Sequence, residues 1–405
     1  MFQELMLMVS VLMFQIPGVA EPPRVAMGQR SQVISQIEQP QEQPKHDVLS
    51  ILRPSEREII PRSAVPVLLL SNTRDFSDRG VVVEDTFYSA FFNDETQSIS
   101  IQGSRAAAKY PELRVESNRD KKRIRATEGF ITESEAIWSA SWKEFGAAYV
   151  LSLECAKAND KRCESEDYIT KLVNALVYVG GGKAGILNNR PAFNPDSPRD
   201  VAGVAARPVF SYNPPGQLLP GSGTGRADTT VYAPGMRFPI ESKSAYANSQ
   251  VYNPGGGEGP PGEQCDARNY SFPWWDNFCE TRGHVTVMCP TGKGHQGQDI
   301  RPSSCVKDKH FSVSATDGTV TRIGKFSVFI AAGDSTQYRY LHMSNVTVKV
   351  GDKVSKGSRI GKVSNVYTAP TTIHLHFEIW QNIDPIGFVP VSPYMSLVKA
   401  YERLP

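Results

Sequence analysis

Several features that would assign this chain to a common class are missing. The formal net charge of its 405 residues is only +2, and Lys and Arg form no phosphate-binding stripe. We therefore expect no nucleic-acid partner. Internal repeats are absent, and the lack of any Cys-x-x-Cys pair argues against a structural metal site built from cysteine. With 40% hydrophobic and 21% charged residues, the chain is typical of a globular protein long enough for two domains plus linkers.

The N-terminus lacks a hydrophobic run long enough for a membrane span. An apolar run from Leu5 to Phe14, followed by the small residues Gly18 and Ala20, predicts a secretory signal peptide over residues 1–20. The absence of Lys and Arg before the run is atypical, and a buried helix is the alternative interpretation. No cysteine lies near the expected cleavage point, which disfavours a lipid anchor. We expect an exported protein of the periplasm or cell envelope, with no stable membrane span after signal cleavage.

Cysteine usage agrees with export. The chain has six cysteines, an even number, as expected for disulfide bonds in an oxidising compartment. The sequence alone allows many connectivities. Proximity favours the pairs Cys155–Cys163 and Cys279–Cys289, which leaves Cys265–Cys305.

Composition divides the chain before its C-terminal region into three segments. Residues 21–60 are rich in Pro and Gln and predict a disordered tether. Residues 61–187 predict a smaller α+β domain of unknown role, with strands at "VPVLLL" and "FGAAYVLSLEC" and a hairpin from "TFYSAFFN" to "SISIQG". A helix within "CESEDYITKLVNALVYVGG" is expected to begin after Ser165 and to stop at Gly180-Gly181. Residues 188–232, rich in Pro and Gly, predict a flexible linker.

The run "TTIHLHFEIW" places two histidines on an expected strand. Because strand side chains alternate, His374 and His376 point to one face. The apolar residues Ile373, Leu375 and Phe377 cover the other face. Two imidazoles therefore converge on one place, although a solvent-facing pair on an amphipathic strand is the alternative when the pattern is taken alone.

The run "GKGHQGQDI" supplies further metal-ligand types. If it is extended, His295 and Asp299 face one side, and Gly297 between them lets the backbone pass close to whatever they hold. Together with one histidine of the pair they make a three-ligand set of the kind that a catalytic zinc uses, with a fourth position left for water. The residues alone do not say which histidine, His374 or His376, is the ligand.

A third run, "QYRYLHMSN", ends an alternating strand with His342. Alternation predicts that His342 shares a face with Tyr338 and Tyr340. It would then supply a second imidazole that is not a ligand.

"HQGQD", "YLHM" and "HLHFE", with "ATDGTVTRIG" and "VKVGDKVSKGSRIGKVS" in the intervals, resemble the catalytic domain of the lysostaphin-type (LytM-domain) zinc endopeptidases over about residues 233–390. The resemblance implies a mainly β catalytic domain, an antiparallel two-sheet structure with a groove. It implies zinc as the cofactor, His295, Asp299 and His376 as its ligands, and His342 and His374 as catalytic histidines.

The same resemblance implies peptidoglycan as the partner, with hydrolysis of a peptide bond in its stem or cross-link peptides. In such a site zinc polarises the scissile carbonyl and lowers the pKa of water to roughly 7, while histidines move protons. No sequence feature divides the proton transfers between His342 and His374. The alternative is an autoinhibited or non-catalytic LytM-type regulator that activates another cell-wall hydrolase.

We expect this zinc peptidase domain to span residues 233–400, with a Cys-rich insertion at residues 256–290. The insertion carries four aromatic residues that fit either a small satellite core, the more common outcome, or a groove for peptide or glycan. They are Phe272, Trp274, Trp275 and Phe278.

Overall fold

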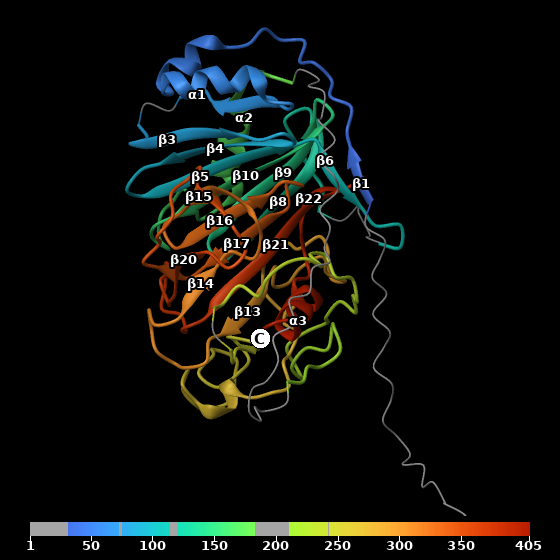
Figure 1. Ribbon diagram of the computed structural model, residues 1–405, viewed down its shortest axis with the longest axis vertical. Helices are drawn as coiled ribbons and strands as arrows, with labels where there is room; N and C mark the ends of the chain where they lie inside the picture. The colour runs from blue at the N-terminus through green and yellow to red at the C-terminus, as the bar shows by residue number, and fades with distance from the viewer. Residues whose placement is uncertain (1–30, 73–74, 114–119, 183–209, 242) are drawn as a thin grey trace, which may run out of the picture.

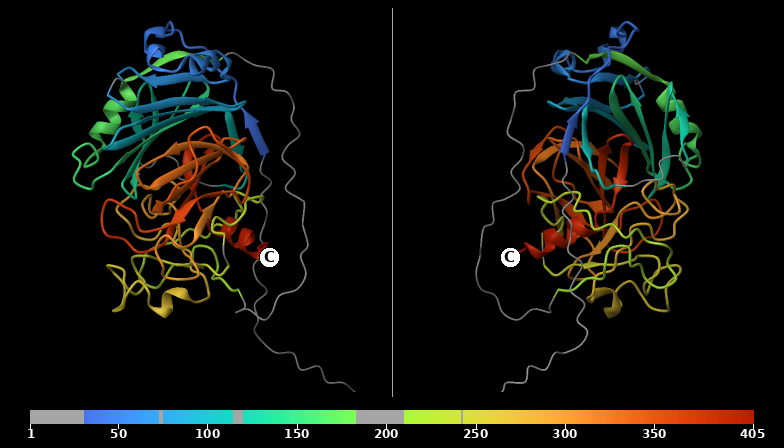
Figure 2. Two further views of the ribbon diagram at one scale, coloured as in Figure 1. Left: turned by 60° about the vertical axis from the view of Figure 1, so that its left-hand side comes forward. Right: turned by 90° about the vertical axis from the view of Figure 1, so that its right-hand side faces the viewer.

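Two β-sheet layers stack on each other in this protein (Figure 1, Figure 2). The computed structural model describes residues 31–72, 75–113, 120–182, 210–241 and 243–405. The predicted signal peptide lies outside these residues. A seven-stranded N-terminal sheet, with helices on its outer side, faces a ten-stranded sheet formed mostly by the C-terminal region. The predicted fold class, a mainly β catalytic domain preceded by a smaller α+β domain, is confirmed.

The N-terminal sheet is antiparallel, in the order β3-β4-β5-β10-β9-β8-β7. The predicted hairpin is β4–β5, and its turn is closed by Asp94, whose carboxylate accepts hydrogen bonds from the N–H groups of Thr96 and Gln97. The strands are β3 (Asp78–Val83), β4 (Phe87–Asn93), β5 (Gln97–Ser104), β7 (Lys122–Ile124), β8 (Thr127–Ser134), β9 (Ile137–Glu144) and β10 (Ala147–Cys155).

The helix of this domain is shorter than predicted. Helix α2 (Glu166–Asn174) begins after Ser165, whose hydroxyl accepts from the N–H of Asp167, but it ends at Asn174. Strand β11 (Leu176–Gly181) follows and pairs with β2 (Pro66–Leu70). The prediction of one helix up to Gly180 is wrong because its last part, "LVYV", consists mainly of β-branched and aromatic residues that find a partner strand.

Part of the expected tether is regular structure. Residues Val48 and Leu52 are buried in the N-terminal core. Local apolar side chains thus outweigh the Pro/Gln-rich composition around them. The elements are β1 (Ser31–Ile34), 3₁₀ helix η1 (His46–Ile51), α1 (Pro54–Ile59) and 3₁₀ helix η2 (Ile60–Arg62), and β1 pairs with β6 (Ala106–Lys109). Residues 210–232 also differ from the expected flexible linker, since Tyr232 is fully buried in the C-terminal core.

The C-terminal sheet has the order β1-β6-β21-β17-β16-β15-β19, and β21 also pairs with β13 and β22. A small second sheet, β14-β20-β18, completes the two-sheet architecture. The elements are β12 (Tyr246–Ala247), 3₁₀ helix η3 (Ala267–Tyr270), β13 (Gln298–Arg301), β14 (Phe311–Val313), β15 (Gly318–Ile323), β16 (Ser327–Ala332), β17 (Gln337–Leu341), β18 (Met343–Ser344), β19 (Lys353–Val354), β20 (Arg359–Val363), β21 (Leu375–Ile383), β22 (Gly387–Val391) and α3 (Tyr394–Glu402).

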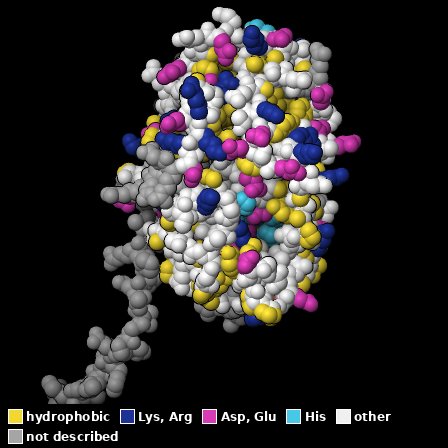
Figure 3. Space-filling view, turned by 180° about the vertical axis from the view of Figure 1, so that it is seen from behind, with side chains coloured by type: hydrophobic (Ala, Val, Ile, Leu, Met, Phe, Trp, Pro, Cys, Tyr) yellow, Lys and Arg dark blue, Asp and Glu magenta, His cyan; other side chains and the backbone are white. Residues whose placement is uncertain are grey.

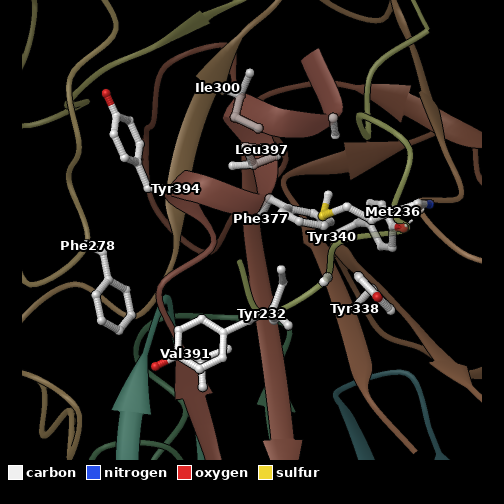
Figure 4. Packing of buried hydrophobic residues seen from close by; sticks show 14 of the residues in the cluster. Tyr232, Met236, Phe278, Ile300, Tyr338, Tyr340, Phe377, Val391, Tyr394 and Leu397 are labelled. Carbon is white, nitrogen blue, oxygen red and sulfur yellow. Dashed lines mark hydrogen bonds between the residues drawn. The ribbon is translucent and has the colours of Figure 1, made fainter. Parts of the chain in front are cut away.

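The C-terminal core lies on one side of β17 and β21. Tyr340 and Phe377 pack against each other there, and Leu397 of α3 covers them (Figure 4). Trp274 and Phe278 of the Cys-rich insertion are fully buried in the same cluster, so the core interpretation holds for them. The opposite side of β17 and β21 faces the N-terminal sheet.

All six cysteines form disulfides, and the pairing follows sequence proximity. The disulfides are Cys155–Cys163, Cys265–Cys305 and Cys279–Cys289.

Within the described ranges, no helix is both long and apolar enough to cross a membrane.

Candidate metal centre

Adjacent strands bring His295, Asp299 and His376 together. Asp299 on β13 lies directly opposite His376 on β21, and His295 precedes β13. The His376 Nδ1 atom is 3.0 Å from both His295 Nε2 and Asp299 Oδ1. His295 Nε2 is 3.4 Å from Asp299 Oδ1. Ligand atoms about 2.0–2.1 Å from a tetrahedral zinc are about 3.3 Å apart, so this triangle fits the ion.

The three side chains are held so that these atoms face one another. His295 Nδ1 lies 3.0 Å from the carbonyl oxygen of Asn277, and His376 Nε2 lies 3.0 Å from Glu378 Oε1. In its neutral form each ring can therefore donate through its outer nitrogen and direct its inner nitrogen at the other two atoms of the triangle. Asn277 also donates through Nδ2 to Asp299 Oδ2 at 2.9 Å. Such outer partners fix the tautomer and orientation of metal ligands.

Gly297 makes the close approach of β13 to β21 possible. A Cβ atom at position 297 would lie 2.6 Å from His376 Nε2 and 2.7 Å from the carbonyl oxygen of Phe377. Real side chains do not tolerate such distances. The backbone therefore passes close to the side chain of His376 at this glycine, and no larger residue fits there.

The backbone of His295 is braced by the Cys-rich insertion. Its carbonyl oxygen accepts from the N–H of Cys279 at 2.9 Å, and its own N–H donates to the carbonyl of Glu280 at 2.9 Å. The Cys279–Cys289 disulfide closes the loop on which this brace sits. The insertion is thus part of the support of the centre.

The charges of the centre suit a cation. Burial opposes ionisation of Asp299, but His295 and His376 beside it hold the pKa of that carboxyl well below its usual range. Burial also lowers the pKa of His376, yet hydrogen bonds to Asp299 and Glu378 outweigh it and raise this pKa to about 10. Two carboxylates around buried imidazoles therefore favour an additional positive charge at this place.

His342 and His374 lie beside the triangle, with their ring centroids 4.4 Å apart. His374 Nδ1 lies 2.9 Å from the carbonyl oxygen of Thr372, while its Nε2 points toward Asp299 Oδ1 at 3.6 Å. Burial and the neighbouring His342 lower the pKa of His374 to about 3, so its imidazole is neutral at physiological pH. The five residues expected from the sequence thus occupy one buried site.

The predicted face of His342 is wrong. Tyr338 and Tyr340 point into the C-terminal core, whereas the ring of His342 stacks on Phe326, 6.1 Å away, on the side of the metal centre. The backbone at His342 has φ +62°, a left-handed conformation that breaks strand alternation. Non-glycine residues held there are often found at functional sites.

One acidic residue reaches the centre from the N-terminal domain. Glu135 lies at the tip of the β8–β9 hairpin, and its Oε2 is 3.4 Å from His342 Nε2. One ligand atom each from Glu135, His295 and His376 lies within 4.8 Å of the others, an arrangement able to hold a metal ion. Burial opposes its ionisation, but His342 and His376 hold the pKa of Glu135 well below its usual range.

The hairpin tip that carries Glu135 has an unusual backbone. Glu135 and Ala136 both have left-handed φ angles, +50° and +55°, where Asn and Gly are the usual residues. Next to the tip, Glu133 pairs with His284 of the insertion at 2.7 Å. On the face shown in Figure 3, histidine side chains are visible at mid-height beside acidic ones. Most of the centre is covered, since the side chains of His295, His342 and His376 are fully buried.

Comparison with known proteins places the C-terminal region. Residues 293–387 match Peptidase family M23. This region therefore resembles the peptidase domains of that family. It includes His295, Asp299, His342 and the His374/His376 pair.

Three similar proteins illustrate the extent of the likeness. The chain is 46% identical to the peptidoglycan DD-endopeptidase ShyA of Vibrio cholerae over 78 residues. This aligned segment covers 18% of this chain and 17% of that protein. Over 102 residues the chain is 34% identical to the stage II sporulation protein Q of Bacillus subtilis, 23% of this chain and 36% of that one. The lysostaphin catalytic domain of Staphylococcus simulans is 21% identical, with a TM-score of 0.25, covering 32% of this chain and 94% of that domain. The matched M23 region therefore spans a minor part of both curated relatives.

Sequence reasoning missed three residues of the site. Glu378 ends the run "HLHFE", two residues after His376. Strand alternation therefore predicts that both side chains lie on the same face. Asn277 and Glu135 carry no local signal, because each comes from a distant loop whose composition is ordinary. Only the packing of the insertion and of the N-terminal domain brings them to the centre.

Proposed function

We propose that this protein is a zinc-dependent metalloendopeptidase that hydrolyses peptide bonds in the stem or cross-link peptides of peptidoglycan during bacterial cell-wall remodelling. The observation that carries the proposal is the triangle of His295, Asp299 and His376 atoms at 3.0–3.4 Å, with two further histidines beside it. The M23 match and the similarity to a peptidoglycan DD-endopeptidase of Vibrio cholerae support the substrate class. The three disulfides support export to the periplasm or cell envelope.

The residues present can carry out each step of such a hydrolysis. Zinc bound by His295, Asp299 and His376 would supply a Lewis acid that polarises the scissile carbonyl and acidifies water. His374, neutral and with Nε2 directed at the centre, can take a proton from the attacking water. His342 Nε2, buried and without a hydrogen-bond partner among the described residues, can stabilise the developing oxyanion or protonate the leaving amine.

The structure has the features of a closed form of such an enzyme. Catalytic zinc sites keep one position open for water and substrate. Here the carboxylate of Glu135, carried by a hairpin of the N-terminal sheet, lies within 4.8 Å of the ligand atoms of His295 and His376 and could occupy that position. This observation favours autoinhibition in the arrangement described. It also keeps a second function in consideration, a non-catalytic regulator that activates another cell-wall hydrolase.

Five single alanine variants of the full-length protein test the assignment of roles. We expect His295→Ala, Asp299→Ala and His376→Ala to lose zinc. We expect the other two variants, His342→Ala and His374→Ala, to retain it but to lose turnover by about 10²–10⁴-fold, the usual contribution of a general acid or base. Metal analysis is performed beside turbidity loss of purified cell walls.

The assays are run both in the native chain and in a Glu135→Ala background, so that closure does not hide activity. Release of peptide fragments by the zinc-loaded protein supports the endopeptidase. Stoichiometric zinc without hydrolysis in either background would favour the regulator instead. Loss of zinc from His374→Ala but not from His376→Ala would reverse the assignment within the pair.

A further inference from the structure

A second carboxylate of the N-terminal domain is bound by the M23 region, at the turn between β15 and β16. Glu154 of β10 accepts hydrogen bonds from Arg322 Nη2 at 2.8 Å and from the Ser327 hydroxyl at 2.5 Å. Its other oxygen accepts from the backbone N–H groups of Lys325 and Phe326. The side chains of Glu154 and Arg322 are both fully buried. We call the four donors the carboxylate nest.

The nest is shaped for a carboxylate. A Cβ atom at Gly324 would lie 2.0 Å from Glu154 Oε2, so the turn leaves room for the ligand only because it has glycine there. Two backbone N–H groups, a hydroxyl and a guanidinium together form charge-assisted hydrogen bonds of the strong kind. All four donors belong to the M23 region, and the acceptor belongs to another domain.

Within the M23 region, Arg322 has no anionic partner of its own. Among the described residues, its side chain donates to Ser98 and Glu154, both on the N-terminal sheet. Its Nη1 is buried and has no hydrogen-bond partner in the described chain. Within its own domain, the Arg322 guanidinium stacks on the ring of Phe329, 4.6 Å from the ring centroid. Removal of the N-terminal sheet would therefore leave a cation without a counter-charge.

The nest lies on the same face as the metal centre. Phe326, whose N–H binds Glu154, stacks its ring on His342 at 6.1 Å. Along the sheet, Phe329 also contacts Arg339 at 4.5 Å, and Arg339 lies 3.6 Å from Glu378, the partner of His376. At roughly 3.3 Å per residue, a few residues of extended peptide would connect the two places.

The two inserted carboxylates come from neighbouring positions. Ile137, two residues after Glu135, lies opposite Glu154 in the β9–β10 pair. The interface around them is mixed: Arg339 is bonded to the hydroxyls of Ser139 and Ser152, while Ile137 packs with Phe326 and Phe329. Interfaces between domains of one chain generally resemble transient ones, for which relative motion is the default expectation.

We propose that the carboxylate nest is a substrate subsite, which binds a free carboxylate of the peptide near the scissile bond, and that Glu154 occupies it as a mimic in the closed form. The inference rests on the proposed function, since it concerns the same groove. The ligand class is a peptide with an ionised carboxyl group. Arg322 is then a specificity-determining residue, and separation of the domains exposes the metal centre and the nest together.

Binding to zinc-free, full-length protein tests the proposal independently of hydrolysis. All variants carry Glu135→Ala. The probes are a fluorescein-labelled stem tetrapeptide of peptidoglycan with free carboxylates and the same peptide with its carboxylates converted to carboxamides. The test variant adds Glu154→Ala, and Glu154→Gln is prepared as the conservative form in case the alanine variant does not fold. The matched control adds Glu84→Ala, which removes a different interdomain contact, to Thr319 and Lys353.

By fluorescence anisotropy, we expect the Glu154 variants to bind the free-carboxylate peptide about 10- to 100-fold more tightly than the carboxamide, as for loss of a charge-assisted hydrogen bond. The Glu84→Ala control should lack this preference, and Arg322→Gln added to Glu154→Ala should abolish it. Equal binding of both probes, no binding of either, or a preference that survives Arg322→Gln would overturn the proposal. If the preference is found but no zinc-loaded variant hydrolyses cell walls, the subsite stands and the endopeptidase proposal fails.

Discussion

Replacement of Glu135 by alanine should activate the protein. The carboxylate contacts His342 and lies within reach of His295 and His376, and its lowered pKa keeps it ionised at neutral pH. Removing it takes away one carboxylate–imidazole contact of 3.4 Å that exists only in the closed form. A hydrogen bond to a charged group contributes about 1.5–3 kcal/mol, which sets the upper bound for this longer contact. The ratio of closed to open molecules should therefore fall by up to about 150-fold.

The rate should follow the open population, because only an open molecule admits a peptide. If the closed form predominates in the native protein, initial rates of cell-wall hydrolysis by zinc-loaded Glu135→Ala should rise by a factor within that range. Hydrogen exchange of the β8–β9 amides provides a second readout, since opening should speed it in parallel.

A matched control lies on the same hairpin. Glu128 of β8 is 73% exposed and pairs with Lys121 at the surface, so Glu128→Ala changes the same charge without touching the centre. Its rate should equal that of the native protein. If Glu135→Ala, with full zinc content, is no faster than Glu128→Ala and its hairpin exchanges no faster, the hairpin does not close the site.

Further predictions concern stability and the support of the centre. Gly297→Ala should weaken zinc binding by about 10- to 100-fold, as for loss of an outer support, whereas Gly257→Ala, with open space around its Cβ, should not. Trp274→Ala should lower the free energy of unfolding by about 3–5 kcal/mol in denaturant titrations, against less than about 0.5 kcal/mol for exposed Val306→Ala. Burial raises the pKa of Asp276 from 3.8 to about 7, so its contribution to stability is complete below pH 3.8 and is lost as the pH rises through 7. Asp276→Asn should remove up to about 4 kcal/mol of the change in the free energy of unfolding between these pH values. Denaturant titrations over this pH range test this, and an unchanged dependence of the unfolding free energy on pH would contradict the assignment. Thiol labelling of the unreduced, unfolded protein should detect no free cysteine, and six reactive thiols would refute the disulfides.

Local patterns were sufficient for most strands and for the composition of the site. Alternation predicted β17 and β21, and proximity predicted the three disulfides, because these features depend on residues close in sequence. Alternation failed at His342, where one left-handed residue turns the side chain to the other face. It also cannot reveal the end of α2, because the strand after Asn174 depends on a partner far along the chain.

Contacts between domains were beyond the reach of the sequence. Glu135 stands in an ordinary acidic turn, and Glu154 in a strand that reads as buried and apolar. Their roles come from the placement of one sheet over another, which no periodicity encodes. Arg322 likewise shows no signal of its own, since a strand arginine is most often at the surface.

The hydrogen bonds that brace His295 make the position of this expected metal ligand depend on the redox state of its surroundings. The backbone of His295, the first expected metal ligand, is hydrogen-bonded to the backbone of Cys279 and Glu280. These two residues lie in a loop that the Cys279–Cys289 disulfide closes. In a reducing compartment that loop would be released, and the ligand would lose the support that presets its position. A newly made chain would then bind the metal weakly until oxidation forms the Cys279–Cys289 disulfide. On the proposed function, the bond that stabilises the insertion would thus also delay the assembly of the site until the protein reaches an oxidising compartment.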